Sequence, residues 1–226
     1  KKALDINSQL GEAHTNLGLL YQERGQINQA LLHLKTAISI QPASYQAITN
    51  LALTHQGEYE PTAAKHYYKN ALRIQPRFET ALINLGAVEQ VLGHFDEAIR
   101  LFKEALEINQ DNAEARWNLS LVYLLTGRIR EGWALYESRF ELNAADTDPR
   151  GRSETRLRKI PTSMIGTKVL IWCEQGLGDS IQFIRYTKQI ADKGAMVTIE
   201  CPKPLQKILS TVDSRIRVVS EKQNLN

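Results

Sequence analysis

Cysteine is scarce in this sequence, long apolar runs are missing, and the charge is nearly balanced. The two cysteines, Cys173 and Cys201, form no Cys-x-x-Cys or other metal-binding spacing. No apolar stretch reaches the roughly 20 residues that a membrane-spanning helix needs. A net charge of +3 is too small to predict nucleic acid or a membrane as a partner. The first residues lack the pattern of a signal peptide, so we expect a cytoplasmic protein. Because the sequence does not begin with Met, we also expect a segment upstream of it.

Sequence motifs of common active sites are also missing. No HExxH motif, G-x-S-x-G nucleophile elbow or phosphate-binding P-loop occurs. The histidines are scattered along the first half of the chain without cysteine partners: His14, His33, His55, His66 and His94. We therefore expect no metal site and no cofactor in this chain.

A repeat with a period of 34 residues runs through the first two thirds of the chain. An asparagine followed by leucine recurs at this period, at Asn16, Asn50, Asn84 and Asn118. Alanines keep the same spacing: Ala30, Ala64 and Ala98, then Ala37, Ala71 and Ala105. The period predicts pairs of helices, because a repeat of 20 to 50 residues is one supersecondary unit. We place the repeats at 11–44, 45–78, 79–112 and 113–142, with the tail of an earlier repeat at 1–10.

Turn and stop residues support the same division. Glycines lie between the two expected helices of repeats one, three and four, at Gly25, Gly93 and Gly127, where positive φ ends a helix at little cost. Tyr59 replaces this glycine in repeat two, so that turn departs from the pattern of the others. Proline ends the second helix of two repeats, at Pro42 and Pro76, since it cannot donate the helical hydrogen bond.

This pattern of Asn-Leu-Gly, spaced alanines and closing proline resembles the tetratricopeptide repeat (TPR) family. The resemblance implies a right-handed superhelix of helix pairs with a concave groove, in which neighbouring repeats supply each other's core. Repeat four departs from the pattern, because Gly132 replaces the alanine. Trp133, Tyr136 and Phe140 place aromatic side chains on its expected second helix. These aromatics suggest a surface that packs against something other than a further repeat.

The four asparagines are the candidate peptide-binding residues. Their equal spacing places Asn16, Asn50, Asn84 and Asn118 in a line along the solenoid. A side-chain amide offers two donors and an acceptor, so it can pair with both polar groups of a peptide unit. The ladder resembles that of the TPR region of O-linked N-acetylglucosamine transferase, which implies an extended protein segment held by its backbone. The alternative is that each amide binds a neighbouring helix and only fixes the packing of the repeats.

The chain changes character after repeat four. Residues 143–164 are turn-rich and polar, as in a linker. The apolar runs within residues 165–226 then predict an incomplete β-α-β-α-β, Rossmann-like unit, with strands at 168–173, 196–201 and 217–219. Its first expected helix runs from Asp179, as cap, to Gly194. The overall expectation is a mostly helical chain: a TPR α-solenoid at 1–142 followed by this small α/β unit.

A glycine loop precedes that expected helix. Gly176 and Gly178 bring backbone amides to a helix N-terminus, which favours a phosphate or a sugar hydroxyl. One interpretation is a dinucleotide fingerprint, with Glu200 at the ribose-binding spacing, although a bulky Ile181 stands where a third small residue belongs.

The other interpretation is a resemblance to the heptosyltransferase-like glycosyltransferases that follow TPR regions. It is carried by residues 171–183 (Ile-Trp-Cys-Glu-Gln-Gly-Leu-Gly-Asp-Ser-Ile-Gln-Phe), 200–205 and 132–137. The resemblance implies that Asp179 is the general base toward an acceptor hydroxyl, whereas a helix cap is the ordinary alternative. It also implies that the nucleotide-sugar donor binds in a second domain, so this chain alone is not expected to transfer sugar.

The sequence therefore favours a protein- or peptide-binding TPR module attached to the N-terminal part of a glycosyltransferase-like domain. The alternative is a fragment of a protein glycosyltransferase whose repeats present the acceptor and whose full length uses a nucleotide sugar. A structural scaffold without a ligand groove is the second alternative. Nothing in the residues predicts the oligomeric state.

Overall fold

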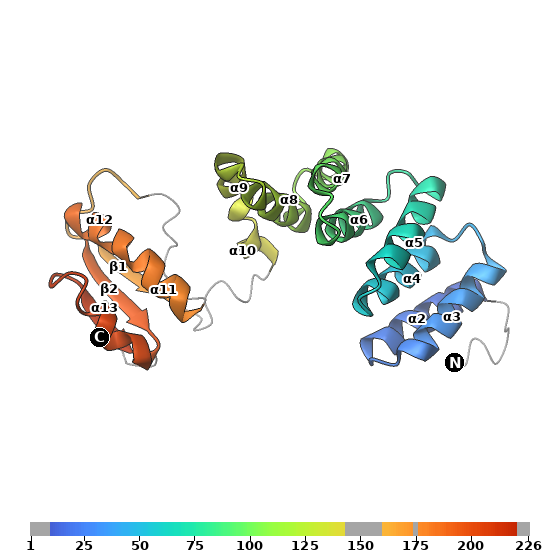
Figure 1. Cartoon of the computed structure of the whole chain (residues 1–226), viewed down its shortest axis with the longest axis horizontal. Coiled ribbons are helices and arrows are strands. Elements are labelled where there is room, and N and C mark those ends of the chain that lie inside the picture. Colours follow the sequence, from blue (N-terminus) through green and yellow to red (C-terminus); the bar gives the residue numbers. More distant parts are fainter. Residues whose placement is uncertain (1–9, 143–159, 174–175, 221–226) are drawn as a thin grey trace. The chain divides into compact units, whose positions relative to one another are not determined.

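The computed structural model describes residues 10–142, 160–173 and 176–220 (Figure 1). The chain divides into two compact units, Lys1–Gly151 and Arg152–Asn226. The division falls within 143–164, the expected linker, of which 143–159 lie outside the described residues. Figure 1 shows helices throughout the first unit and the strands in the second.

The first unit is a helical solenoid of antiparallel helix pairs. Its helices follow one another in the order α2 (Gly11–Glu23), α3 (Ile27–Ile40), α4 (Tyr45–Gly57), α5 (Pro61–Ile74), α6 (Glu79–Val91), α7 (Phe95–Ile108), α8 (Ala113–Leu125), α9 (Ile129–Tyr136) and α10 (Arg139–Leu142). Each first helix packs on the second helix of its own repeat, and each second helix packs on the next first helix. The first helices α2, α4, α6 and α8 also contact one another in succession. They therefore form one continuous side of the solenoid.

The core of the repeats pairs small residues with large ones. The alanines that keep the 34-residue period are fully buried, as are Tyr68 and Phe102. A Cβ added at Gly86 would lie 2.6 Å from Phe102, and one at Gly18 would lie 2.6 Å from Leu34. These glycines therefore let the two helices of a repeat approach closely, because interiors are packed without spare volume.

The four turns within the repeats share one geometry. The backbone N–H of Gln26, Glu60, His94 and Arg128 donates to the carbonyl five residues earlier. The preceding residue takes a positive φ each time, 68°, 79° and 78° at the predicted glycines. Tyr59 takes the same conformation with φ of 59° and is 93% exposed. All four are thus Schellman caps, and the turn with tyrosine forms like the others.

The fourth repeat ends earlier than the aromatic pattern predicts. α9 stops at Tyr136, so Phe140 lies on the separate helix α10, and its placement on the second helix was wrong. Ser138 accounts for the interruption, since both its backbone N–H and its hydroxyl donate to the carbonyl of Leu135. The ring of Tyr136 lies 4.6 Å from that of Trp133 and 5.0 Å from that of Trp117.

The second unit contains a three-stranded parallel sheet. Its elements are β1 (Lys168–Trp172), α11 (Leu177–Phe183), the 3₁₀ helix η1 (Ile184–Tyr186), α12 (Thr187–Asp192), β2 (Met196–Cys201), the 3₁₀ helix η2 (Lys203–Leu205), α13 (Gln206–Leu209) and β3 (Arg217–Ser220). The strand order is β1-β2-β3, with Lys168 opposite Met196 and Thr198 opposite Arg217. Buried side chains of Ile199, Cys201 and Leu209 belong to its core. The predicted strands are thus present and parallel.

The helix predicted from Asp179 to Gly194 is not continuous. It is divided into α11, η1 and α12. Near the second break, the hydroxyl of Thr187 donates to the carbonyl of Ile184 at 2.7 Å. Such local hydrogen bonds from threonine compete with a regular helix.

Candidate functional site

The four asparagines lie at equivalent places on successive first helices. Asn16 is on α2, Asn50 on α4, Asn84 on α6 and Asn118 on α8. Asn16 is exposed and the other three are half-buried. Within the described residues, none of the four side-chain amides forms a hydrogen bond with the protein. Their donors and acceptors thus stay available on one side of the solenoid.

The helical period places each asparagine in a stripe of four residues. Residues four before, three after and seven after it share its side of the helix. The asparagines and these stripe neighbours, together called the amide face, form four rows: Glu12, Gln46, Thr80 and Glu114; Asn16, Asn50, Asn84 and Asn118; Leu19, Leu53, Ala87 and Leu121; Glu23, Gly57, Val91 and Leu125. All members of the first and last rows are exposed, and the third row is half-buried.

A surface pocket lies beside the first asparagine. Its volume is about 580 Å³, and its lining includes Glu12 and Asn16 of repeat one together with Gln46 of repeat two. These three residues belong to the amide face. Neutral polar residues of the connection between the repeats, Gln41 and Ser44, line the same pocket. The face is therefore hollowed where it passes from repeat one to repeat two.

Glutamines on the same helices make contacts that the asparagines do not. The hydroxyl of Thr54 on α4 donates to Gln22 Oε1 on α2 at 3.4 Å, which links two neighbouring repeats. The hydroxyl of Tyr68 donates to Gln56 Oε1 at 2.9 Å, and burial raises the pKa of this tyrosine. The side-chain amides that support packing are thus glutamines, six residues after the asparagines.

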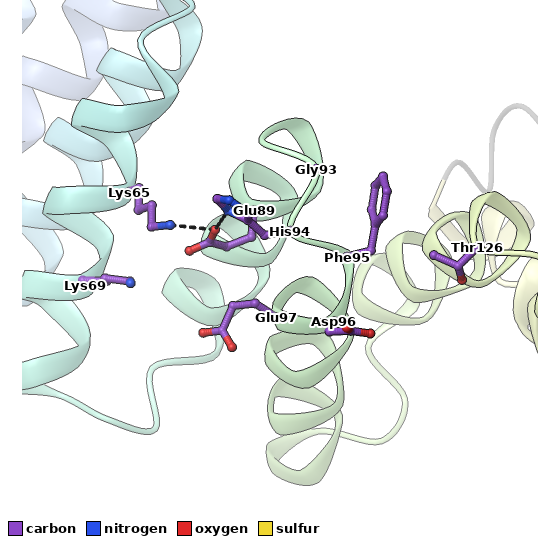
Figure 2. A pocket seen from close by; sticks show the side chains of 9 residues that line it. All are labelled: Lys65, Lys69, Glu89, Gly93, His94, Phe95, Asp96, Glu97 and Thr126. Atoms are coloured by element: carbon purple, nitrogen blue, oxygen red, sulfur yellow. Dashed lines mark hydrogen bonds and ion pairs between the residues drawn. The ribbon is translucent and has the colours of Figure 1, made fainter.

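A second pocket lies where repeats two and three meet. Its volume is about 700 Å³. Figure 2 shows Lys65 and Lys69 of α5 pointing toward Glu89 of α6 and Glu97 of α7. Glu89 Oε2 accepts hydrogen bonds from Lys65 Nζ at 2.9 Å and from His94 Nδ1 at 2.7 Å. The carboxylate is thereby held by a lysine of the preceding helix and by the histidine that precedes α7.

Hydrogen bonds determine the charge state of the two carboxylates. Burial alone would raise the pKa of Glu89, whose side chain is 1% exposed, but the bonds from Lys65 and His94 outweigh it and lower the pKa. The pKa of Glu97 is lowered mainly by its hydrogen bonds from Arg100. Both groups are therefore carboxylates at neutral pH.

Sequence reasoning missed the role of Glu89. The residue occupies the place of Tyr21 in repeat one and Tyr123 in repeat four, where a large ring packs between helices. A carboxylate at a core position of a repeat needs partners. The signal was therefore present in the aligned repeats, as an acidic residue where tyrosine recurs.

The glycine loop of the second unit is described from Gly176 onward, and residues 174–175 lie outside the described residues. Gly176 precedes α11, while Gly178 and Asp179 lie in its first turn and are exposed. Asp179 is inside the helix, so the expectation that it caps α11 was wrong. Glu200, the ribose-binding candidate, is buried at the end of β2. The sugar-binding role of the loop and the general-base role of Asp179 stay predictions.

The described residues contain neither a metal-binding cluster nor a membrane-spanning helix. No group of three or more His, Cys, Asp or Glu side chains in this part of the chain is arranged to hold a metal ion. No helix among these residues combines the length and the apolar character needed to cross a bilayer.

Comparison with known proteins identifies the repeats. A family model described as tetratricopeptide repeat matches residues 11–44, and one described as TPR repeat matches residues 91–127. No curated protein matches the chain. No comparison supports the glycosyltransferase resemblance of residues 165–226.

Several solved structures share the solenoid. TTC0263, a thermophilic TPR protein of Thermus thermophilus, is 29% identical with a TM-score of 0.56, over 66% of this chain and 82% of that one. PilF of Pseudomonas aeruginosa is 30% identical with a TM-score of 0.55, over 59% of this chain and 61% of that one. The first TPR of Spaghetti (RPAP3), bound to the HSP90 peptide SRMEEVD, is 20% identical with a TM-score of 0.51, over 54% and 96%. The helical unit of this chain is therefore built from tetratricopeptide repeats.

Proposed function

We propose that the repeats hold an extended polypeptide against the amide face and grip it through its backbone. One observation carries this proposal: four asparagine amides at equivalent places, accessible and without a protein partner among the described residues. The glutamines Gln22 and Gln56 make the contacts expected of amides that fix packing. The asparagines are thus left for a ligand.

The chemistry of the amide fits a peptide backbone. Its oxygen accepts from a peptide N–H and its nitrogen donates to a peptide carbonyl, so one asparagine can satisfy both groups of a peptide unit. Helices in contact lie about 8–10 Å apart. An extended chain advances about 3.3 Å per residue. Each repeat would therefore meet about three residues, and the four asparagines on the order of ten.

The energetics predict a modest affinity. A net hydrogen bond contributes about 0.5–1.5 kcal/mol, so eight contribute about 4–12 kcal/mol before the peptide is ordered. Ordering a flexible segment offsets several kcal/mol of this. We expect a dissociation constant in the micromolar range or weaker. A solved protein of the same fold holds a peptide, which supports the proposal at the level of fold.

The test uses a fluorescein-labelled, unstructured decapeptide of Ser, Thr, Leu and Val and measures its binding by fluorescence anisotropy. The double variant Asn50→Ala/Asn84→Ala should weaken binding at least about tenfold, because up to four hydrogen bonds are lost. Its melting temperature should stay nearly unchanged. A peptide with N-methylated backbone amides should also bind more weakly, since it lacks the donors.

The matched control is Gln56→Ala, which removes the acceptor of the buried Tyr68 hydroxyl. It should lower the melting temperature and leave peptide binding as it is. The opposite pattern for the asparagine variant, a large loss of stability with unchanged binding, would show that the asparagines fix packing. The chain would then act as a scaffold.

Glycosyl transfer by the full-length protein is the second proposal. It is motivated by the exposed Asp179, which follows a parallel strand and two glycines, Gly176 and Gly178. Ligands of parallel α/β sheets bind outside the carboxyl ends of the strands. The test is transfer from UDP- or GDP-sugars to a protein acceptor by the full-length protein, with Asp179→Asn. Transfer that the substitution leaves unchanged would remove Asp179 from the mechanism, and no transfer from any sugar would end the proposal.

A further inference from the structure

Charge is distributed unequally between the two kinds of helix in the repeats. The first helices α2, α4, α6 and α8 contain a single Lys or Arg residue, Arg116. Its guanidinium donates to the carboxylate of Glu141 on α10 and to the carbonyl of Asp111, so it is already engaged. The second helices carry most of the basic residues of the repeats: Lys35, Lys65, Lys69, Arg73, Arg100, Lys103 and Arg130. Basic side chains are therefore kept off the helices that carry the asparagines.

The amide face itself carries charge of one sign. Glu12 and Glu23 lie in the stripe of Asn16, four residues before and seven after it, and both are exposed. Glu114 lies four residues before Asn118 and is also exposed. No Lys or Arg belongs to any of the four stripes, all of which lie in the described part of the chain. The charges of this face thus repel acidic side chains of a bound segment and attract basic ones.

The last row of the amide face also becomes more apolar from repeat one to repeat four. Seven residues after each asparagine, the chain has Glu23, then Gly57, then Val91 and Leu125. Val91 is 76% exposed and Leu125 62% exposed, although both are aliphatic. They occupy the same place on two successive first helices that contact each other, so the last row of the amide face is aliphatic over repeats three and four. The half-buried Leu19, Leu53, Ala87 and Leu121 extend beside the asparagines along the whole face.

From these features we infer that the amide face selects extended segments with Lys or Arg toward one end and aliphatic side chains toward the other, and disfavours acidic segments. The basic end lies over repeat one, near Glu12 and Glu23. The aliphatic end covers Val91 and Leu125. This inference rests on the proposed function, because the asparagines hold the backbone of whichever segment binds. Charge and apolar contact then choose among segments that the backbone contacts alone would not distinguish.

Three labelled decapeptides of equal length test the inference by fluorescence anisotropy at low and at physiological salt. All carry Leu and Val at one end, and the other end carries Lys, Ser or Glu. We expect the Lys peptide to bind at least about tenfold more tightly than the Glu peptide at low salt. The difference should shrink at higher salt, because salt screens exposed charges. The variant Glu12→Gln/Glu23→Gln should reduce the preference and leave the Ser peptide nearly unaffected.

The apolar end is tested with Val91→Ser/Leu125→Ser, which should weaken all three peptides severalfold. The matched control is Leu32→Ser, which alters a leucine of α3 that is 58% exposed and lies outside the amide face. It should change none of the three affinities.

The outcomes separate the inference from the proposed function. A Glu peptide that binds as tightly as the Lys peptide, with both weakened by Asn50→Ala/Asn84→Ala, would overturn the inference and keep backbone capture. Binding that is insensitive to the asparagine variant would overturn the proposed function, and so would a failure of all three peptides to bind. In either case the inference would also be lost.

Discussion

The guanidinium of Arg128 lies 4.1 Å from the centre of the Tyr123 ring, at the two places that His94 and Glu89 occupy one repeat earlier. The Glu89–His94 pair is joined by a hydrogen bond of 2.7 Å. In repeat two the same two places hold a histidine and then a glutamate, 2.6 Å apart, so the order is reversed. A cation over a ring and two imidazole–carboxylate pairs thus bridge the same turn. Repeats two, three and four therefore place different chemistry at the same two positions of the turn.

Glu89 differs from its counterparts because a third residue, Lys65 of the preceding repeat, also binds it. The variant Glu89→Gln keeps the shape and removes the charge, which leaves the ammonium of Lys65 without its partner. We expect the free energy of unfolding at pH 7 to fall by about 1–3 kcal/mol, less than for a fully buried pair because Lys65 is 26% exposed. Urea unfolding measures this. As control, Glu104→Gln alters an exposed partner of Arg100 and should change stability by no more than about 1 kcal/mol.

The same carboxylate predicts a dependence of stability on pH. The folded pKa of Glu89 is lowered, so the unfolded state binds the proton more readily. Its stabilising contribution is therefore fully present above the unfolded pKa, which is near 4.5, and is lost as the pH falls through the folded value. The wild-type protein should lose more stability than Glu89→Gln when the pH is lowered below about 4.5. Parallel pH profiles of the two proteins would refute a role for this carboxylate.

The turn of repeat two has a strained backbone at Tyr59, which a glycine should relieve. Tyr59 has φ of 59°, the left-handed conformation that glycine adopts in the other repeats, and its side chain is 93% exposed. This conformation costs a residue with a Cβ roughly 1–2 kcal/mol. Replacing Tyr59 by glycine removes that cost and loses little packing, although glycine gains entropy when unfolded. We expect a gain of about 0.5–1 kcal/mol in urea unfolding. The reverse change, Gly93→Ala, should destabilise repeat three by a similar amount, and a neutral result for both would show that the turn is not strained.

Much of the first unit could be predicted because its signals are local and periodic. The asparagines recur every 34 residues, and a turn glycine such as Gly93 keeps the same period in three of the four repeats. Each repeat places these residues at the same point of its helix pair. The ion pair of Glu89 could not be read locally, since its partner Lys65 lies 24 residues earlier, on α5. The end of α9 was misjudged because Ser138, which closes it, lies outside the aromatic pattern.

The second unit shows a similar limit. Its strands follow from short runs of β-branched and apolar residues, and these were placed nearly correctly. Asp179 was expected to cap the helix because aspartate is a common cap residue, but Gly176 is the cap of α11 and the aspartate lies inside its first turn. An aspartate near a helix start suits both places, because a negative charge is favourable throughout the first turn. Composition alone thus does not distinguish a cap from a first-turn residue.

Gly86 is expected to be indispensable for the close contact between α6 and α7. A Cβ at this position would lie 2.6 Å from Cε1 and 2.9 Å from Cδ1 of Phe102, whose ring is fully buried. Gly86→Ala should therefore lower the free energy of unfolding by about 1–3 kcal/mol, because a packed ring cannot move without displacing its neighbours. Gly57→Ala provides the control, since no atom lies within 4 Å of the added Cβ at the end of α4. It should be neutral or slightly stabilising, because alanine favours a helix more than glycine does. Equal stabilities of the two variants in urea would mean that α7 shifts freely, and that the glycine does not set the distance between the helices.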